Sequence, residues 1–238
     1  MARTAQLQLP LIAPAQAQKH VTVNEALSRL DALAQLRIKA FDQTVVPTSP
    51  KEGDAYQLGP EPAGEWSGQG GKIAIRANGG WTFVAPKVGW TAWDEAGLCA
   101  RMYHGRGWMA DAVAVSPGGA GTRHRVIEFD HALLAGATNL TAVSIPAGAQ
   151  VIGLSGRVVA GLSGAGLTGW RIGVEGADNR YGSGLGVAQN SYLLGLSGAP
   201  VTYYSATPIL LSAEGGAFAG GTIRLALHVV ELEPPQAV

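Results

Sequence analysis

The stretch Glu175–Gly182 is the most polar part of the C-terminal half of the chain, and its residue types suit sugar recognition. It lies between predicted strands, so we expect a loop at the edge of the fold, where binding residues concentrate. Binding a sugar requires planar polar groups that bond to neighbouring hydroxyls and an aromatic face for the apolar side of the ring. Both kinds occur here, and two further tyrosines are adjacent later in the chain. The candidate glycan-binding residues are Asp178, Asn179, Arg180, Tyr181, Tyr203 and Tyr204.

Two other interpretations of this stretch stay open. It is either a structured turn with Tyr181 in the core, or a contact with a neighbouring subunit. Glycoside hydrolysis would need two carboxyl groups about 5–10 Å apart. The candidates are Glu175, Asp178 and Glu214, and nothing in the sequence gives one of them a raised pKa. We therefore expect capping and solvated carboxylates here, and no catalytic residues.

No other pattern in the sequence predicts catalysis or metal binding. The five His and the single Cys form neither H-E-x-x-H nor C-x-x-C, and a G-x-S-x-G elbow is absent. We predict no enzyme activity, no metal site and no cofactor. With 17 basic and 17 acidic residues the formal net charge is +0, so the chain lacks the basic surface that nucleic acid requires. No apolar run is long enough for membrane insertion, and Pro10 and Pro14 interrupt the N-terminal apolar stretch, so no signal peptide is expected.

The elements that must position the candidate residues are short strands. Residues 123–238 combine alternating apolar and polar positions with recurrent turn signals, which predicts a jelly-roll-like β-sandwich that carries the glycan site. Ile223, Leu225, Leu227 and Val229 are the clearest alternation. The Gly-rich segment 115–122 is the predicted linker before this domain. The overall fold class predicted is mainly β.

Residues 47–114 are predicted to form a small Trp-rich domain of β-hairpins. Asn78-Gly79 separates two apolar runs, and this dipeptide is the strongest hairpin turn signal because both residues must adopt positive φ. A second hairpin is predicted from Leu98 to Met109 around a Gly-rich turn. Such hairpins cannot bury their faces alone and must stack on something.

Residues 1–46 are predicted to form an extended arm and the one helix, which spans residues 22–42 with a capping box at Thr22 and Glu25. The arm is either disordered or docks on a neighbouring subunit. The helix either packs on its own domain or joins a short oligomeric bundle, because its 4-3 apolar spacing also suits a coiled coil. The candidate anchoring and oligomerisation residues are Leu9, Leu11, Ile12, Val23, Leu27, Leu30 and Ile38.

The segment Leu9–Asp31, LPLIAPAQAQKHVTVNEALSRLD, is distinctive and resembles the start of the DUF2793 family. The resemblance continues through Pro47-x-x-Pro50-x-x-Gly53-Asp54, then Trp66, Gly79-Gly80-Trp81 and Gly89-Trp90-x-x-Trp93, and it covers about the first 110 residues. Trp170–Val174 and Asn179–Gly184 look like the β-rich tail of members from gene transfer agents, which are phage-derived particles.

The resemblance implies a head spike or fibre subunit on the surface of a phage or gene transfer agent particle, assembled in the bacterial cytoplasm. Its implied partners are a capsid or spike-base protein and the host capsular polysaccharide. By analogy with fibres we expect a homotrimer. Two alternatives stay open, a purely structural connector and a capsule-degrading hydrolase.

Overall fold

The computed structural model describes residues 2–12 and 19–237, and it divides the chain into two compact units. One unit runs up to Gly119 and includes the tail from Pro235, and the other spans Ala120–Pro234. The division lies inside the predicted linker, residues 115–122. The predicted region boundary near residue 46 is not a division between units, because the arm, helix and hairpins belong to one unit. The predicted mainly-β class is confirmed.

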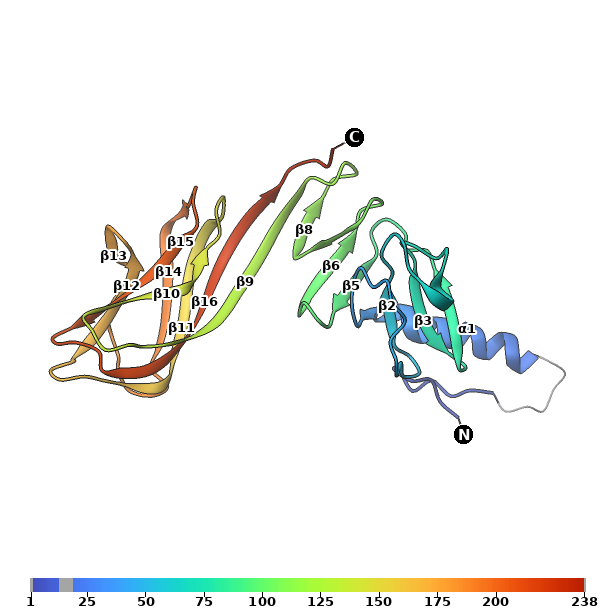
Figure 1. Cartoon of the computed structure of the whole chain (residues 1–238), viewed down its shortest axis with the longest axis horizontal. Coiled ribbons are helices and arrows are strands. Elements are labelled where there is room, and N and C mark those ends of the chain that lie inside the picture. The colour runs from blue at the N-terminus through green and yellow to red at the C-terminus, as the bar shows by residue number, and fades with distance from the viewer. Residues whose placement is uncertain (1, 13–18, 238) are drawn as a thin grey trace. The chain divides into compact units, whose positions relative to one another are not determined.

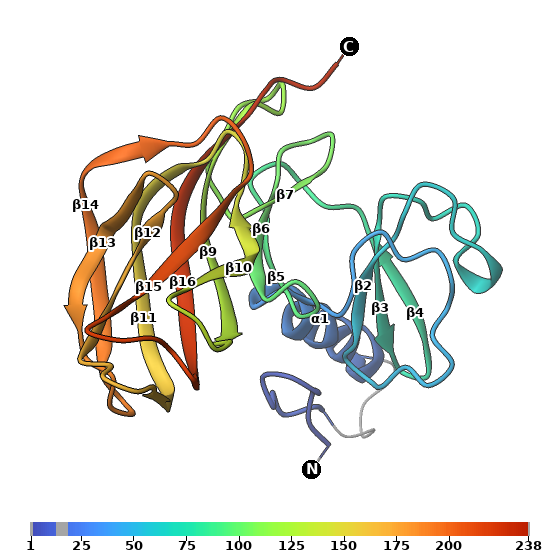
Figure 2. The ribbon, with the colours of Figure 1, turned by 60° about the vertical axis from the view of Figure 1, so that its left-hand side comes forward.

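The described residues of the N-terminal unit form one α-helix, one 3-10 turn and two small sheets with the orders β2-β3-β4 and β1-β5-β6-β7. Both predicted hairpins are present, β3–β4 and β6–β7 (Figure 2). In the first, Asn78 and Gly79 adopt φ of 53° and 73°, as a two-residue turn between Ala77 and Gly80 requires. The elements are α1 (Lys19–Ala34), β1 (Arg37–Ile38), β2 (Ala55–Gln57), η1 (Gly64–Trp66), β3 (Ile73–Ala77), β4 (Gly80–Val84), β5 (Thr91–Asp94), β6 (Cys99–Tyr103), β7 (Trp108–Ala110) and β8 (Ala112–Val115).

The helix differs from the prediction at both ends. It begins at Lys19, which places Thr22 inside it, so the predicted capping box is wrong. It ends at Ala34, because Arg37 and Ile38 pair in parallel with Trp93 and Asp94 and leave the helix axis. Ile38 is therefore a fully buried strand residue of the unit's core and not part of a helix face.

The apolar face predicted for α1 is not the face that it buries. Val23 and Leu30 are 39% and 54% exposed and Leu27 is half-buried, whereas Asp31 and Ala32 are buried. The helix packs on its own unit, as one of the two alternatives predicted, but it does so through Ala32 and Leu33 and not through Val23 and Leu30. Oligomerisation through this face stays a prediction.

The buried Asp31 holds the arm against the helix. Its carboxylate accepts hydrogen bonds from the Thr4 hydroxyl at 2.7 Å, from the Gln6 amide at 2.8 Å and from the Leu7 amide. The described arm residues thus fold back on their own helix, an arrangement that neither sequence-based alternative included. Leu9 and Leu11 are half-buried, and Ile12 is exposed with its backbone bonded to Asn24.

Replacing Asp31 with alanine is expected to release the arm. The change leaves the buried Thr4 hydroxyl without this acceptor, which costs about 1–3 kcal/mol, and it removes the acceptor of the part-buried Gln6 and Leu7 amides. Hydrogen exchange at the Gln6 and Leu7 amides should accelerate by at least tenfold. Glu25→Ala, at an exposed position of the same helix, is the control. Equal protection in the two variants would contradict the assigned role of Asp31.

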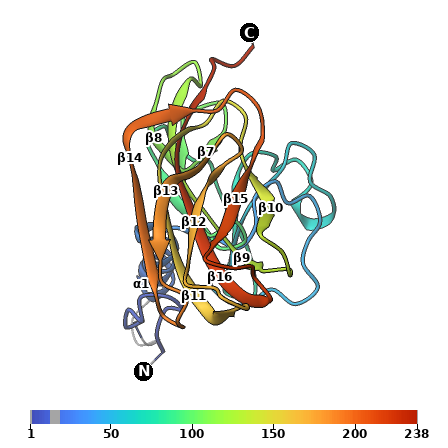
Figure 3. The ribbon, with the colours of Figure 1, turned by 90° about the vertical axis from the view of Figure 1, so that its left-hand side faces the viewer.

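The C-terminal unit is a sandwich of two antiparallel sheets. One has the order β10-β15-β12-β13, seen side by side in Figure 3, and the other contains β14-β11-β16-β9, seen in Figure 2. The pairs β9–β16, β10–β15, β11–β14 and β12–β13 are all antiparallel, so the chain is one long hairpin wrapped into a jelly roll. The strands are β9 (Gly121–Ala132), β10 (Thr138–Ile145), β11 (Gln150–Ser163), β12 (Gly169–Val174), β13 (Ala177–Leu185), β14 (Tyr192–Thr202), β15 (Thr207–Glu214) and β16 (Gly220–Glu233).

The core between the sheets is built from the inward positions of these strands. The predicted alternation in β16 is confirmed, since Ile223, Leu225, Leu227 and Val229 are at most 1% exposed. They pack with a buried tryptophan, Trp170, whose indole nitrogen donates to the Gly186 carbonyl at 3.0 Å. This core fixes the sheets that carry the candidate glycan residues.

Candidate functional site

Of the predicted glycan-binding residues, Asp178, Asn179, Arg180 and Tyr181 lie on an edge strand, whereas Tyr203 and Tyr204 follow the end of β14. Residues 177–185 form β13, which pairs with β12 through Val174↔Ala177 and Ile172↔Gly182. The loop prediction is therefore wrong. Asp178, Asn179 and Arg180 belong to the hairpin that β12 and β13 form. The turn of this hairpin is Glu175-Gly176, where Gly176 adopts a φ of 79°.

Tyr181 belongs to the core. Its side chain is 2% exposed, so the predicted alternative with Tyr181 in the core is confirmed for the burial, although the residue lies on strand β13 and not in a structured turn. Burial, together with a hydrogen bond to Tyr203, raises the pKa of Tyr181, so the hydroxyl stays protonated throughout the physiological range. A ring in this position has no free face on which a sugar can stack.

The Tyr181 hydroxyl links the two segments that carry the candidate glycan-binding residues, 178–181 and 203–204. It shares a hydrogen bond of 2.8 Å with the hydroxyl of Tyr203, which lies in the turn after β14. The Tyr203 amide donates to the Ala149 carbonyl at 3.0 Å, and the Gly148 amide donates to the Tyr203 carbonyl at 2.7 Å. Three hydrogen bonds therefore fix the turn that carries Tyr204.

Tyr204 is the most exposed large side chain of the cluster, with 90% of its surface accessible. Asn179 and Arg180 are also exposed. Asp178 is half-buried and forms an ion pair of 2.8 Å with Arg171 on the neighbouring strand β12, which occupies one of its carboxylate oxygens. The residues free to meet a ligand are thus Asn179, Arg180 and Tyr204.

Two of the three carboxylates considered for hydrolysis have partners within the fold. Asp178 is ion-paired with Arg171, while the Glu214 carboxylate accepts the Gly184 amide at 3.0 Å. Glu175 is exposed at the hairpin tip. Two of the three thus have structural partners, in line with the expected capping role.

Among residues 2–12 and 19–237, no group of three or more His, Cys, Asp and Glu side chains is placed to hold a metal ion. Within the same residues, no helix has the length and apolar character needed to cross a membrane.

The family comparison concerns the N-terminal unit. Residues 23–109 match the model of a family described as "Protein of unknown function (DUF2793)". The match confirms the predicted resemblance within these residues, which are fewer than half of the chain. The jelly roll and the cluster around Tyr204 lie outside it. No curated protein matches the sequence.

Two solved structures are similar to part of the chain. "Cyanophage Pam1 capsid asymmetric unit" is 20% identical, with 47% of this chain and 84% of that chain covered and a TM-score of 0.34. "Acidic stable capsid structure of Helicobacter pylori bacteriophage KHP30" is 15% identical, with 47% and 98% covered and a TM-score of 0.28. TM-scores this low give neither likeness any weight for fold or function.

Proposed function

We propose that this protein is an appendage subunit, a head spike or fibre, of a phage or gene transfer agent particle, and that its jelly roll binds polysaccharide on the host surface. The match of residues 23–109 to the DUF2793 family supports the particle role through the resemblance to gene transfer agent members described above. The jelly roll is a fold shared by viral capsid proteins and lectins, which makes it compatible with both parts of the proposal.

The observation that carries the binding role is the exposed ring of Tyr204 on a fixed turn. The Tyr204 side chain has 90% of its surface in water, so covering the apolar face of its ring is favourable. The apolar face of a sugar ring can cover it. The bonds of Tyr203 hold the turn before any ligand arrives, so little conformational entropy is lost on binding. Asn179 and Arg180 supply donors and an acceptor for hydroxyl groups.

Particles that carry Tyr204→Ala are expected to assemble normally and to adsorb poorly. Weak single sites gain strength through the number of copies, so a tenfold loss per site, about 1.4 kcal/mol, becomes a larger loss for the particle. Electron microscopy would count assembled particles, and a cell-adsorption assay would measure binding.

Tyr192→Ala is the matched control, because Tyr192 is 66% exposed on β14 of the same unit and outside the cluster. Equal adsorption of the two variants would contradict the binding role of Tyr204. Failure of assembly in Tyr204→Ala particles would favour a structural connector.

A further inference from the structure

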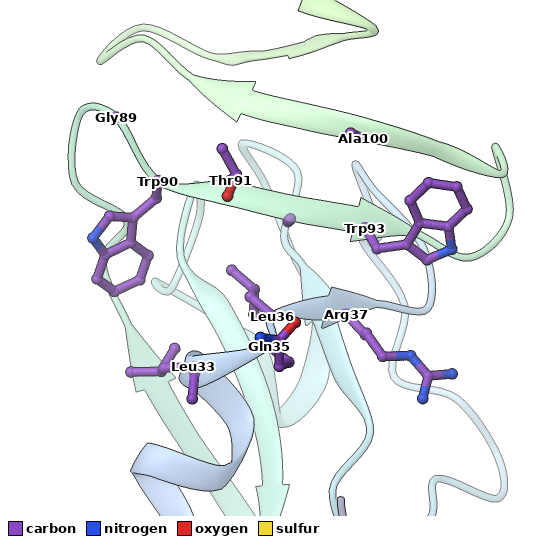
Figure 4. A pocket seen from close by; sticks show the side chains of 11 residues that line it. Leu33, Gln35, Leu36, Arg37, Gly89, Trp90, Thr91, Trp93 and Ala100 are labelled. Carbon is purple, nitrogen blue, oxygen red and sulfur yellow. The ribbon is translucent and has the colours of Figure 1, made fainter. Parts of the chain in front are cut away.

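The N-terminal unit contains a groove that the sequence analysis did not predict. It has a volume of about 640 Å³ and lies between the C-terminal end of α1, strand β1 and strand β5. Figure 4 shows Trp90 and Leu33 at one end of the groove and Trp93 and Arg37 at the other. Each of these residues belongs to the unit that ends at Gly119, so the groove is complete within one unit.

Trp93 points out of its sheet and is 44% exposed. In β5 the side chains alternate, with Ala92 and Asp94 buried at 4% and 3% and Thr91 and Trp93 exposed. Asp94 fixes this alternation, because its carboxylate pairs with Arg101 at 2.7 Å and accepts the Ala96 and Gly97 amides. The indole is therefore held in the groove by the buried face of its own strand.

A charged pair lies beside the indole. Arg37 is directly opposite Trp93 in the parallel pairing of β1 with β5, and its guanidinium contacts Glu95 at 2.5 Å. Lys39 contacts the other oxygen of Glu95 at 2.7 Å, and this hydrogen bond holds the pKa of Glu95 below its ordinary value. The side chain of Arg37 remains 57% exposed, so several of its five N–H donors face solvent.

The charges of this end of the groove balance. Arg37 and Lys39 are matched by Glu95 and by Asp54, which lies 3.8 Å from the Lys39 ammonium. A nucleic acid or another polyanion gains its affinity from uncompensated positive charge, which is missing here. A flat aromatic face beside paired donors and acceptors instead suits a neutral ring that has one apolar face and a rim of hydroxyls.

We propose that this groove binds a neutral saccharide, with the ring stacked on Trp93 and its hydroxyls bonded to the exposed N–H donors of Arg37. The site is separate from the Tyr204 cluster and does not depend on it. The chain would then contact sugar through both of its units.

The test uses the full-length chain and neutral oligosaccharides built on glucose, mannose and N-acetylglucosamine. Binding is followed by the amide and indole signals in nuclear magnetic resonance spectra. We expect at least one series to shift the signals of residues 33–37 and 89–93. Trp93→Ala should weaken that binding at least tenfold, whereas Trp93→Phe, which keeps an aromatic face, should retain part of it.

Leu98→Ala is the control, since Leu98 is 74% exposed in the turn between β5 and β6 and does not line the groove. Absence of binding across all three series would overturn the proposal, as would equal binding by Trp93→Ala and Leu98→Ala. Tyr204→Ala should leave these shifts unchanged, which separates failure of this site from failure of the jelly-roll site. Thermal unfolding of each variant verifies that it is folded.

Discussion

Replacing Trp170 with alanine is expected to destabilise the C-terminal unit by about 3–5 kcal/mol, the range for removal of a large buried aromatic side chain. Trp170 is 2% exposed and packs in the core between the two sheets. Its loss also removes the hydrogen bond to the Gly186 carbonyl. Because a domain of this kind is stable by only about 5–15 kcal/mol, this one change removes a large share of the total.

The measurement is urea unfolding followed by circular dichroism. Tyr204→Ala removes an aromatic side chain of the same unit that is 90% exposed, and it should cost less than about 0.5 kcal/mol. Similar midpoints for the two variants would show that Trp170 does not support the core in the way described here.

Replacing Gly195 with alanine is expected to separate the edge strands of the two sheets. An added Cβ at Gly195 would lie 2.1 Å from the carbonyl oxygen of Tyr181, which is backbone and cannot move alone. Strand β13 would have to shift away from β14, at a cost of about 1–3 kcal/mol. The shift would also disturb the Tyr181–Tyr203 bond and with it the turn of Tyr204.

Gly198→Ala is a closely matched control, because it lies on the same strand and its added Cβ would meet no heavy atom within 4 Å. Amide hydrogen exchange along β13 and β14, with the free energy of unfolding, distinguishes the two variants. An equal effect at both positions would mean that the close approach of β13 and β14 is not a constraint.

The features that could be predicted from the sequence are those encoded locally. The turn at Asn78-Gly79 depends on two residues, and the burial of Ile223 and Leu225 follows from the period of a single strand. Strand β10 and most of strands β13 and β14 were not predicted from the sequence. Asp178 and Asn179 are poor strand formers, and β13 exists because it pairs with β12.

Long-range contacts explain the remaining errors. The helix was extended to residue 42 because Ile38 continued its spacing, but Ile38 pairs with Asp94, far along the chain. For the same reason no pattern could place Arg37 beside Trp93 in a groove. One long-range contact instead joins residues that the sequence analysis had singled out. The hydroxyl groups of Tyr181 and Tyr203, from two separate candidate segments, are hydrogen-bonded to each other.

The antiparallel pairing of β9 with β16 runs from Gly121↔Glu233 to Ala132↔Thr222, and Figure 1 shows the two strands alongside each other. Strand β16 also lies between β9 and β11, so the strand of this unit that is translated last occupies a central position in its sheet. On the ribosome, β9 and β11 must therefore wait for almost the whole unit to be translated before their shared neighbour exists. We expect slow, late closure of this sheet, because pairings so distant in sequence carry a large loop-closure entropy. Until then the nascent chain exposes unpaired strand edges, which makes this stage of synthesis the one most dependent on chaperones.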